Sequence, residues 1–117
     1  MKEDTKNEIM GRFISYTFHQ AKNKLTIIDR AIYLDLIYSL LAITKEPEDF
    51  YNGIQISIRQ LVEEVNISKP TVVKALKNLQ DNGLIKRTKR NNVGPKQAYR
   101  YSIVIPEGIP LNTILNR

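Results

Sequence analysis

The residues best suited to chemistry in this 117-residue chain are cations, and they gather in one segment. Residues 68–101 contain nine Lys and Arg side chains against a single acid, Asp81, which gives a net charge of +8. The remaining residues contain nine cations and eleven acids, for a net charge of −2. Such a local concentration favours nucleic-acid binding, because cations that neutralise phosphates release counterions. The alternative interpretation is a solvated basic surface without a partner.

The side chains used by enzymes and metal sites are sparse in this sequence. There is no Cys and only one His, His19, so the chain offers neither a disulfide framework nor a thiolate metal site. The acids Glu46, Glu48 and Asp49 lack a partner His or Asp elsewhere, which favours a solvated turn over a metal site. No nucleophile with a base, no carboxylate pair and no Gly-rich phosphate loop is visible. We therefore expect no enzymatic activity, no cofactor and no metal ion.

The chain length fits a single domain, and its apolar stretches are short. The stretch at residues 37–43 is far shorter than the roughly 20 residues that a membrane-spanning helix needs. The charged N-terminus has no signal-peptide core. We expect a cytoplasmic protein without a membrane partner.

Two short helices joined by a tight turn are predicted within residues 57–83. The first begins at Ser57 and Gln60, which form a Ser-x-x-Gln capping box that satisfies unpaired backbone N–H groups. Asn66 tolerates the left-handed conformation that ends helices, and Ile67 is then expected to point inward. The second helix therefore starts at once.

The second helix of this pair is marked at both ends. Ser68 suits the N-cap, Pro70 fits the first turn because its missing N–H costs little there, and Gly83 stands just past the last periodic position. The predicted apolar stripe consists of Val72, Ala75, Leu76 and Leu79. The predicted opposite face consists of Lys69, Thr71, Val73, Lys74, Lys77 and Asn78.

A short strand and a hairpin are predicted around the two helices. Residues 54–56 alternate as a strand before the first helix, and residues 86–90 form the outgoing strand of the hairpin. Residues 91–96 supply its turn. In the returning strand, residues 99–105, aromatic and β-branched side chains face the core while Arg100 faces out. The tyrosines could instead stack unpaired bases, but their alternation with apolar residues favours core packing.

These residues resemble the winged helix-turn-helix superfamily of DNA-binding proteins over residues 54–104. The resemblance is carried by LVEEVNIS, then SKPTVVKALKNL, and then GLIKR leading into the basic hairpin. Val62 stands where the family usually has Ala, and Asn66 where it often has Gly. The resemblance implies an α+β, mostly α fold with a β-hairpin wing at about residues 86–100, here with an extra N-terminal segment. It also implies a recognition helix at about residues 69–82 that enters the major groove of double-stranded DNA.

The candidate DNA contacts follow from that placement. Base edges would be read by Thr71, Val73, Lys74 and Asn78, since Asn pairs with adenine and Lys with guanine. Ser68 and the free N–H groups beside it would hold a phosphate. The full set is Ser68, Lys69, Thr71, Val73, Lys74, Lys77 and Asn78 on the helix, with Lys86, Arg87, Lys89, Arg90, Lys96 and Arg100 on the wing.

The first third of the chain is predicted to be a helical support. Residues 1–7 are expected to be frayed, and residues 8–20 suit either a helix or a strand, of which we favour the helix. Thr26 and Asp29 form a second capping box, here with Asp in place of Glu. The helix that follows is nearly all apolar, as expected of the central helix of the domain or of half a dimer interface. One apolar stripe is Ile27, Ala31, Leu34, Tyr38 and Leu41, and a second is Ile28, Ile32, Leu36 and Leu40.

Three parts of the chain are therefore expected. Residues 1–25 form an N-terminal arm that packs on the core or dimerises, residues 26–105 the winged helix-turn-helix, and residues 106–117 a C-terminal tail. Within them, residues 45–53 are predicted to be a loop and residues 111–116 a helical turn.

The resemblance leaves the biological role open between several kinds of protein. A homodimeric small transcriptional regulator is favoured. Alternatives are a plasmid segregation adaptor that binds a centromere and presents a surface to a motor protein, or a replication-initiation protein. A winged-helix module that binds proteins without touching DNA is a further alternative.

Overall fold

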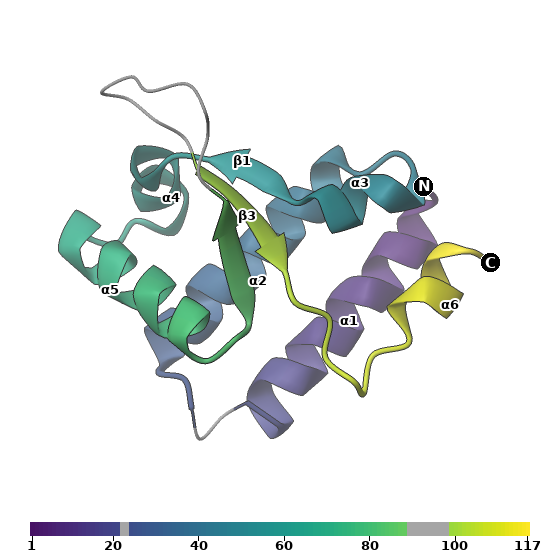
Figure 1. Ribbon diagram of the computed structural model, residues 1–117, viewed down its shortest axis with the longest axis horizontal. Helices are drawn as coiled ribbons and strands as arrows, with labels where there is room; N and C mark the ends of the chain where they lie inside the picture. Colours follow the sequence, from purple (N-terminus) through teal and green to yellow (C-terminus); the bar gives the residue numbers. More distant parts are fainter. Residues whose placement is uncertain (22–23, 89–98) are drawn as a thin grey trace.

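The structure, a computed structural model, describes residues 1–21, 24–88 and 99–117. Its elements are α1 (Glu3–His19), α2 (Ile27–Ile43), α3 (Pro47–Asn52), β1 (Ile54–Ile56), α4 (Ile58–Val65), α5 (Lys69–Asp81), β2 (Ile85–Thr88), β3 (Tyr99–Ile103) and α6 (Leu111–Leu115). The three strands form an antiparallel sheet in the order β1-β3-β2. Figure 1 shows α4 and α5 at one end of the molecule and α1 with α6 at the other. The predicted class, mostly α with a small sheet, is confirmed.

The central helix of the core is α2, which contacts α1, α3, α4, α5 and β1. The predicted Thr26–Asp29 capping box starts it. Within the second predicted stripe, Ile32, Leu36 and Leu40 are buried. The first stripe is different, because Ile27 and Tyr38 are 77% and 66% exposed. Thus α2 supports the core and also presents an apolar surface to solvent.

The N-terminal arm is helical, as favoured over a strand, but α1 begins at Glu3. The expectation that residues 1–7 are frayed is therefore wrong for residues 3–7. Glu3 and Asp4 lie in the first turn, where negative charge interacts favourably with the helix dipole. Ile9 and Phe13 anchor the helix, since both are fully buried and the Phe13 ring packs edge-on against Tyr33. Core packing is thus one role of the arm.

The C-terminal residues pack at the end of the molecule that contains α1. The predicted helical turn is α6, whose Leu111 and Ile114 are buried and which contacts α1. The Arg117 guanidinium also pairs with the Glu8 carboxylate at 2.6 Å. Both chain ends therefore lie side by side, as Figure 1 shows.

The prediction that residues 45–53 form a loop is wrong, because α3 occupies most of them. Glu46 and Asp49 form a capping box around Pro47, and backbone N–H groups hold the pKa of Asp49 below its ordinary value. Phe50 is fully buried and draws the short helix onto the core. Gly53 ends it at φ 81°, where an added Cβ would lie 2.3 Å from the Tyr101 carbonyl oxygen. Only Gly fits this approach.

Candidate nucleic-acid interface

The first helix of the motif, α4, has the predicted ends. The Ser57 Oγ accepts from the Gln60 N–H at 3.0 Å, and the Gln60 side chain accepts from the Ser57 N–H at 2.9 Å. Asn66 adopts the left-handed conformation at φ 54° and ends the helix. Leu61 is fully buried, while Ile67 is half-buried against the core. The turn between α4 and α5 is thereby fixed by local contacts.

The N-terminus of α5 differs in one respect from the prediction. Ser68 occupies the N-cap position, but its side chain makes no capping hydrogen bond with the backbone. Instead, the Ser68 and Thr71 hydroxyl oxygens share a hydrogen bond of 2.9 Å. Pro70 has no N–H to satisfy. The remaining N–H groups of the first turn therefore have no side-chain cap, as a phosphate site at a helix start requires.

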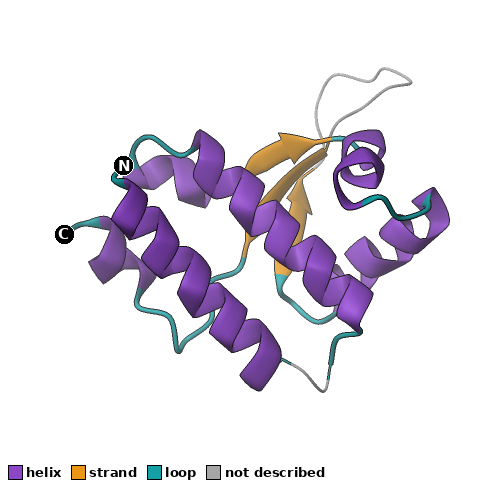
Figure 2. Ribbon diagram, turned by 180° about the vertical axis from the view of Figure 1, so that it is seen from behind, coloured by secondary structure: helices purple, strands orange, loops and turns teal. Residues whose placement is uncertain are grey.

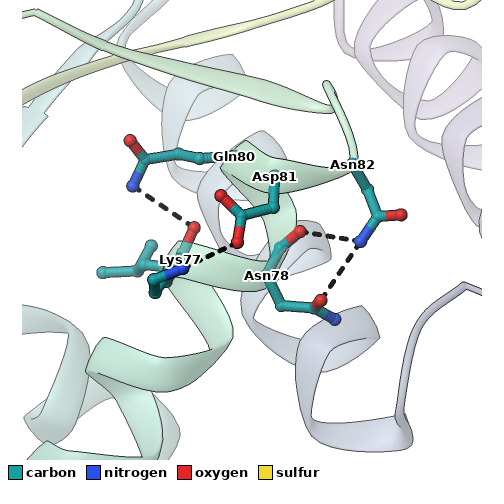
Figure 3. A network of polar contacts seen from close by, with 6 residues as sticks. Lys77, Asn78, Gln80, Asp81 and Asn82 are labelled. Carbon is teal, nitrogen blue, oxygen red and sulfur yellow. Dashed lines mark hydrogen bonds and ion pairs between the residues drawn. The ribbon is translucent and has the colours of Figure 1, made fainter.

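The buried stripe of α5 is the predicted one, whereas Thr71 and Asn78 of the predicted outer face are half-buried. The buried stripe is Val72, Ala75, Leu76 and Leu79. The exposed side carries Lys69, Val73, Lys74 and Lys77. Asp81 lies one turn beyond Lys77 and pairs with it at 2.9 Å (Figure 3). Such an exposed pair contributes little stability, so Lys77 remains available to an external anion.

The wing strands sort their cations onto opposite faces of the sheet. Arg87 pairs with Tyr101 across the strands, on the face whose other residues are buried, and its guanidinium lies 4.4 Å from the Tyr99 ring centroid. Burial raises the pKa of the Tyr101 hydroxyl, and the charge of Arg87 opposes part of the rise. A groove of about 280 Å³ joins Arg87 to Val73 and Lys77 of α5. The neighbouring Lys86 points to the other face, because side chains alternate along a strand.

The arrangement of helices and strands is that of the winged helix-turn-helix fold. Residues 39–94, which include the end of α2 and the elements from α3 to β2, match the model of the MarR family. Members of the MarR family are transcription regulators and not enzymes, and they bind double-stranded DNA, typically as dimers. By comparison with this fold, α5 takes the position of the recognition helix and the antiparallel pair of β2 and β3 takes that of the wing.

A solved structure is similar to most of this winged-helix chain. It is the crystal structure of the ST1889 protein from the thermoacidophilic archaeon Sulfolobus tokodaii, with 25% sequence identity and a TM-score of 0.57. The similarity covers 90% of this chain and 88% of that one. No curated protein matches the sequence. Among the described residues, no helix combines the length and the hydropathy needed to cross a membrane.

Asn78 lies on the same side of α5 as Lys74, but its amide is engaged within the protein. Its Nδ2 donates to the Asp29 Oδ2 at 2.5 Å and lies 3.5 Å from the Lys24 carbonyl oxygen. The Asn78 Oδ1 accepts from the Asn82 Nδ2 at 3.1 Å (Figure 3). The expected pairing of Asn78 with an adenine therefore conflicts with the geometry, since the amide is bonded to the protein at both ends. Thr71 lines, together with Lys74 and Lys77, a groove of about 530 Å³ between α2 and α5.

Arg100 of the wing is also engaged within the protein. Its guanidinium donates to the carbonyl oxygens of Asn52 and Gly53, at 3.1 Å each. This cation therefore ties β3 to the end of α3, and a free DNA contact from Arg100 is disfavoured. The remaining predicted wing contacts, Lys89, Arg90 and Lys96, lie outside the described residues.

A second carboxylate contact between α2 and the motif was not anticipated from the sequence. The Asp35 Oδ2 is buried, and no donor among the described residues reaches it. Burial, a side-chain hydrogen bond with Glu64 of α4 and the negative charge of Glu64 together raise the Asp35 pKa to about 7. Two carboxyl groups can share a hydrogen bond only when one carries a proton. The sequence signal was an acid in the middle of a helix that is nearly all apolar.

Proposed function

We propose that this protein is a transcription regulator that binds specific sites in double-stranded DNA through α5. One observation supports this most directly. Lys69, Lys74 and Lys77 are exposed on the outer side of α5, and Arg87 of the wing lines a groove with Lys77. Together they form one cationic surface, which we call the α5–wing surface. The MarR-family match over the same residues favours regulation over plasmid segregation or replication.

Different residues of the α5–wing surface have different proposed roles. Lys74 and Val73 lie mid-helix, where they can reach a guanine edge and a thymine methyl group. Lys69, Lys77 and the uncapped N–H groups at the helix start would bind phosphates. Arg87 would bind a neighbouring phosphate without regard to sequence, because backbone contacts position a protein but carry no sequence information.

The proposed regulator is a homodimer joined through one face of α1 and α2. Ile14 and Phe18 of α1 are 42% and 45% exposed, and Ile27 and Tyr38 of the adjacent helix α2 are also exposed. The Arg30 guanidinium lies 5.4 Å from the Phe18 ring centroid, which places the two helices' exposed sides together. Figure 2 shows α1 and α2 side by side along this face. We call it the α1–α2 face. An apolar patch of this kind on a regulator of a typically dimeric family suits a second copy.

The dimer is tested by sedimentation equilibrium. Tyr38→Glu should shift the protein towards a monomer, because a carboxylate would be desolvated at the centre of the α1–α2 face. The matched control is Tyr51→Glu, since Tyr51 is 45% exposed on α3 and lies outside this face. A wild-type monomer at high micromolar concentration, or equal effects of the two substitutions, would contradict the proposed dimer.

DNA binding is tested by salt titration on a duplex selected by the wild-type protein from a random-sequence library. With roughly 5 to 8 phosphates bound per protomer, log K should fall with log salt at a slope of about −0.9 per contact. Lys74→Ala should cost about 1–3 kcal/mol and relax preference at one position. Arg87→Ala should weaken binding to all duplexes by about fivefold, whereas its neighbour Lys86→Ala should change it by less than about twofold.

Three results would contradict the proposal. One is binding that hardly depends on salt, and another is equal, sequence-independent loss from the Lys74 and Lys86 variants. The third is a tandem array of genomic sites far from promoters, which would indicate a segregation role. Single palindromic sites at promoters are the result expected of a regulator.

A further inference from the structure

We infer that Asp29 is a positioning residue that sets the orientation of the recognition helix through its hydrogen bond to Asn78. The inference rests on the proposed function, since it assigns DNA-binding consequences to a hydrogen bond within the protein. We call the two residues the Asp29–Asn78 pair.

Asp29 is an unusual carboxylate because it is buried and yet belongs to a helix cap. It is 5% exposed, and its Oδ2 accepts from the Thr26 N–H at 2.9 Å as well as from Asn78. A buried charge is costly unless donors surround it. Here the donors are a backbone N–H and a side-chain amide, and the N-terminal dipole of α2 adds favourable potential. The pair therefore supplies part of the solvation of this charge.

The orientation of the Asn78 amide is determined by its neighbours. Because an ionised carboxylate only accepts hydrogen bonds, the Asn78 Nδ2 must be the atom that faces Asp29. Its Oδ1 then faces Asn82, whose Nδ2 also donates to the Asn78 carbonyl oxygen at 2.9 Å (Figure 3). The amide is thus held at both ends and links the start of α2 to the C-terminal half of α5.

The consequence for DNA binding comes from where the pair lies on α5. Lys74 is four residues before Asn78, so the two residues share a side of the helix, about 6 Å apart along its axis. The apolar contacts of Val72, Leu76 and Leu79 are non-directional and tolerate a small rotation of α5. A hydrogen bond to a buried carboxylate is directional and does not tolerate such a rotation. The pair therefore fixes the direction in which Lys74 points.

The test exchanges the two side chains. Asn78→Asp places two carboxylates in contact and should lower affinity for the library-selected duplex by about tenfold, with loss of preference over a scrambled duplex. The double variant Asp29→Asn with Asn78→Asp restores one donor facing one acceptor at unchanged net charge. It should return both affinity and preference to within about threefold of the wild type. All measurements are made at a temperature where circular dichroism shows every variant folded.

Two controls separate positioning from charge and from folding. Gln80→Glu adds the same charge two residues further along α5 and leaves the Asp29–Asn78 pair unchanged. It should weaken binding to the selected duplex and to the scrambled duplex equally. If Asn78→Asp does not fold, two other measurements replace it. These are the DNA affinity of Asn78→Ala and the NMR signals of the Asn78 side-chain amide in the wild-type protein. The Asn78 side-chain N–H signals should exchange slowly with solvent and keep their chemical shifts when the selected duplex is added.

Several outcomes would overturn the inference. These are wild-type discrimination by Asn78→Asp or Asn78→Ala, a double variant no better than the sum of its parts, and an Asn78 amide signal that shifts on DNA binding. They leave the proposed function intact, because the wild-type protein still binds its duplex. If the wild-type protein binds no duplex, the proposed function fails instead, and the inference fails with it.

Discussion

The central helix α2 contacts each helix of the DNA-binding motif through one carboxylate, and the two contacts are opposites. Asp29 meets an amide donor on α5, whereas Asp35 meets a second acid, Glu64, on α4. The first contact is complete with an ionised carboxylate, and the second needs a proton. The difference shows that a carboxylate between two helices stabilises their contact when its partner can donate a hydrogen bond, and destabilises it when the partner is a second acid.

The two contacts should therefore respond differently to substitution and to pH. The Asp29–Asn78 pair joins α2 to α5 through a hydrogen-bond donor and an acceptor. Removing either side chain therefore leaves a polar group of the other without its hydrogen bond. The Asp35–Glu64 contact is already unsatisfied when both groups are ionised. Removing one of the two negative charges should therefore remove the repulsion between Asp35 and Glu64.

The largest effect is expected when the Asp29–Asn78 pair is broken. Asp29→Ala removes the capping carboxylate of α2 and leaves the Asn78 amide without its acceptor, so the free energy of unfolding should fall by about 2–4 kcal/mol. Urea denaturation at pH 7 measures it. The same substitution at the other contact, Asp35→Ala, should cost far less. Equal losses from the two variants would remove the proposed contrast.

A smaller effect, of opposite sign, is expected from Asp35→Asn. Because the folded protein raises the Asp35 pKa from 3.8 to about 7, the folded state binds this proton more tightly than the unfolded state. The contribution of this contact is therefore full below pH 3.8 and is lost as the pH rises through about 7. After allowance for its partial exposure to solvent, Asp35→Asn should be more stable than the wild type by about 1 kcal/mol at pH 8.

Denaturation midpoints from pH 5 to pH 8 measure this second prediction. The wild type should lose stability relative to Asp35→Asn as the pH rises over that range, and the difference should level off above about pH 7. Glu64→Gln is the matched control, since it removes the other charge of the same contact. A constant difference between wild type and variant across the pH range would contradict the shared proton.

The sequence predicted what local signals encode. The ends of α4 and α5 follow from Ser57, Asn66 and Gly83, each acting within one or two turns, and all three were read correctly. By contrast α3 was missed because Glu46 and Pro47 resemble a turn, and the burial of Phe50 that selects the helix depends on distant residues.

Periodicity located the outer face of α5 but could not resolve its edge. Asn78 lies at the border between that face and the core, and its side is decided by Asp29, 49 residues earlier in the chain. The acid pair was invisible for the same reason, because Asp35 and Glu64 meet only when α2 and α4 pack. Candidate sites on the exposed Lys74 and Lys77 needed no such long-range knowledge.

The smallest expected effect concerns the influence of pH on DNA binding. If α5 is held by the Asp29–Asn78 pair, protonation at the Asp35–Glu64 contact should reach the α5–wing surface only weakly. Affinity for the selected duplex should then change by less than about threefold between pH 6 and pH 8 at constant ionic strength, which is under 1 kcal/mol. Fluorescence anisotropy measures it, with Asp35→Asn as the comparison. A larger change near pH 7 that disappears in Asp35→Asn would show that α4 transmits the protonation to the DNA-binding surface, and the two contacts would then act together.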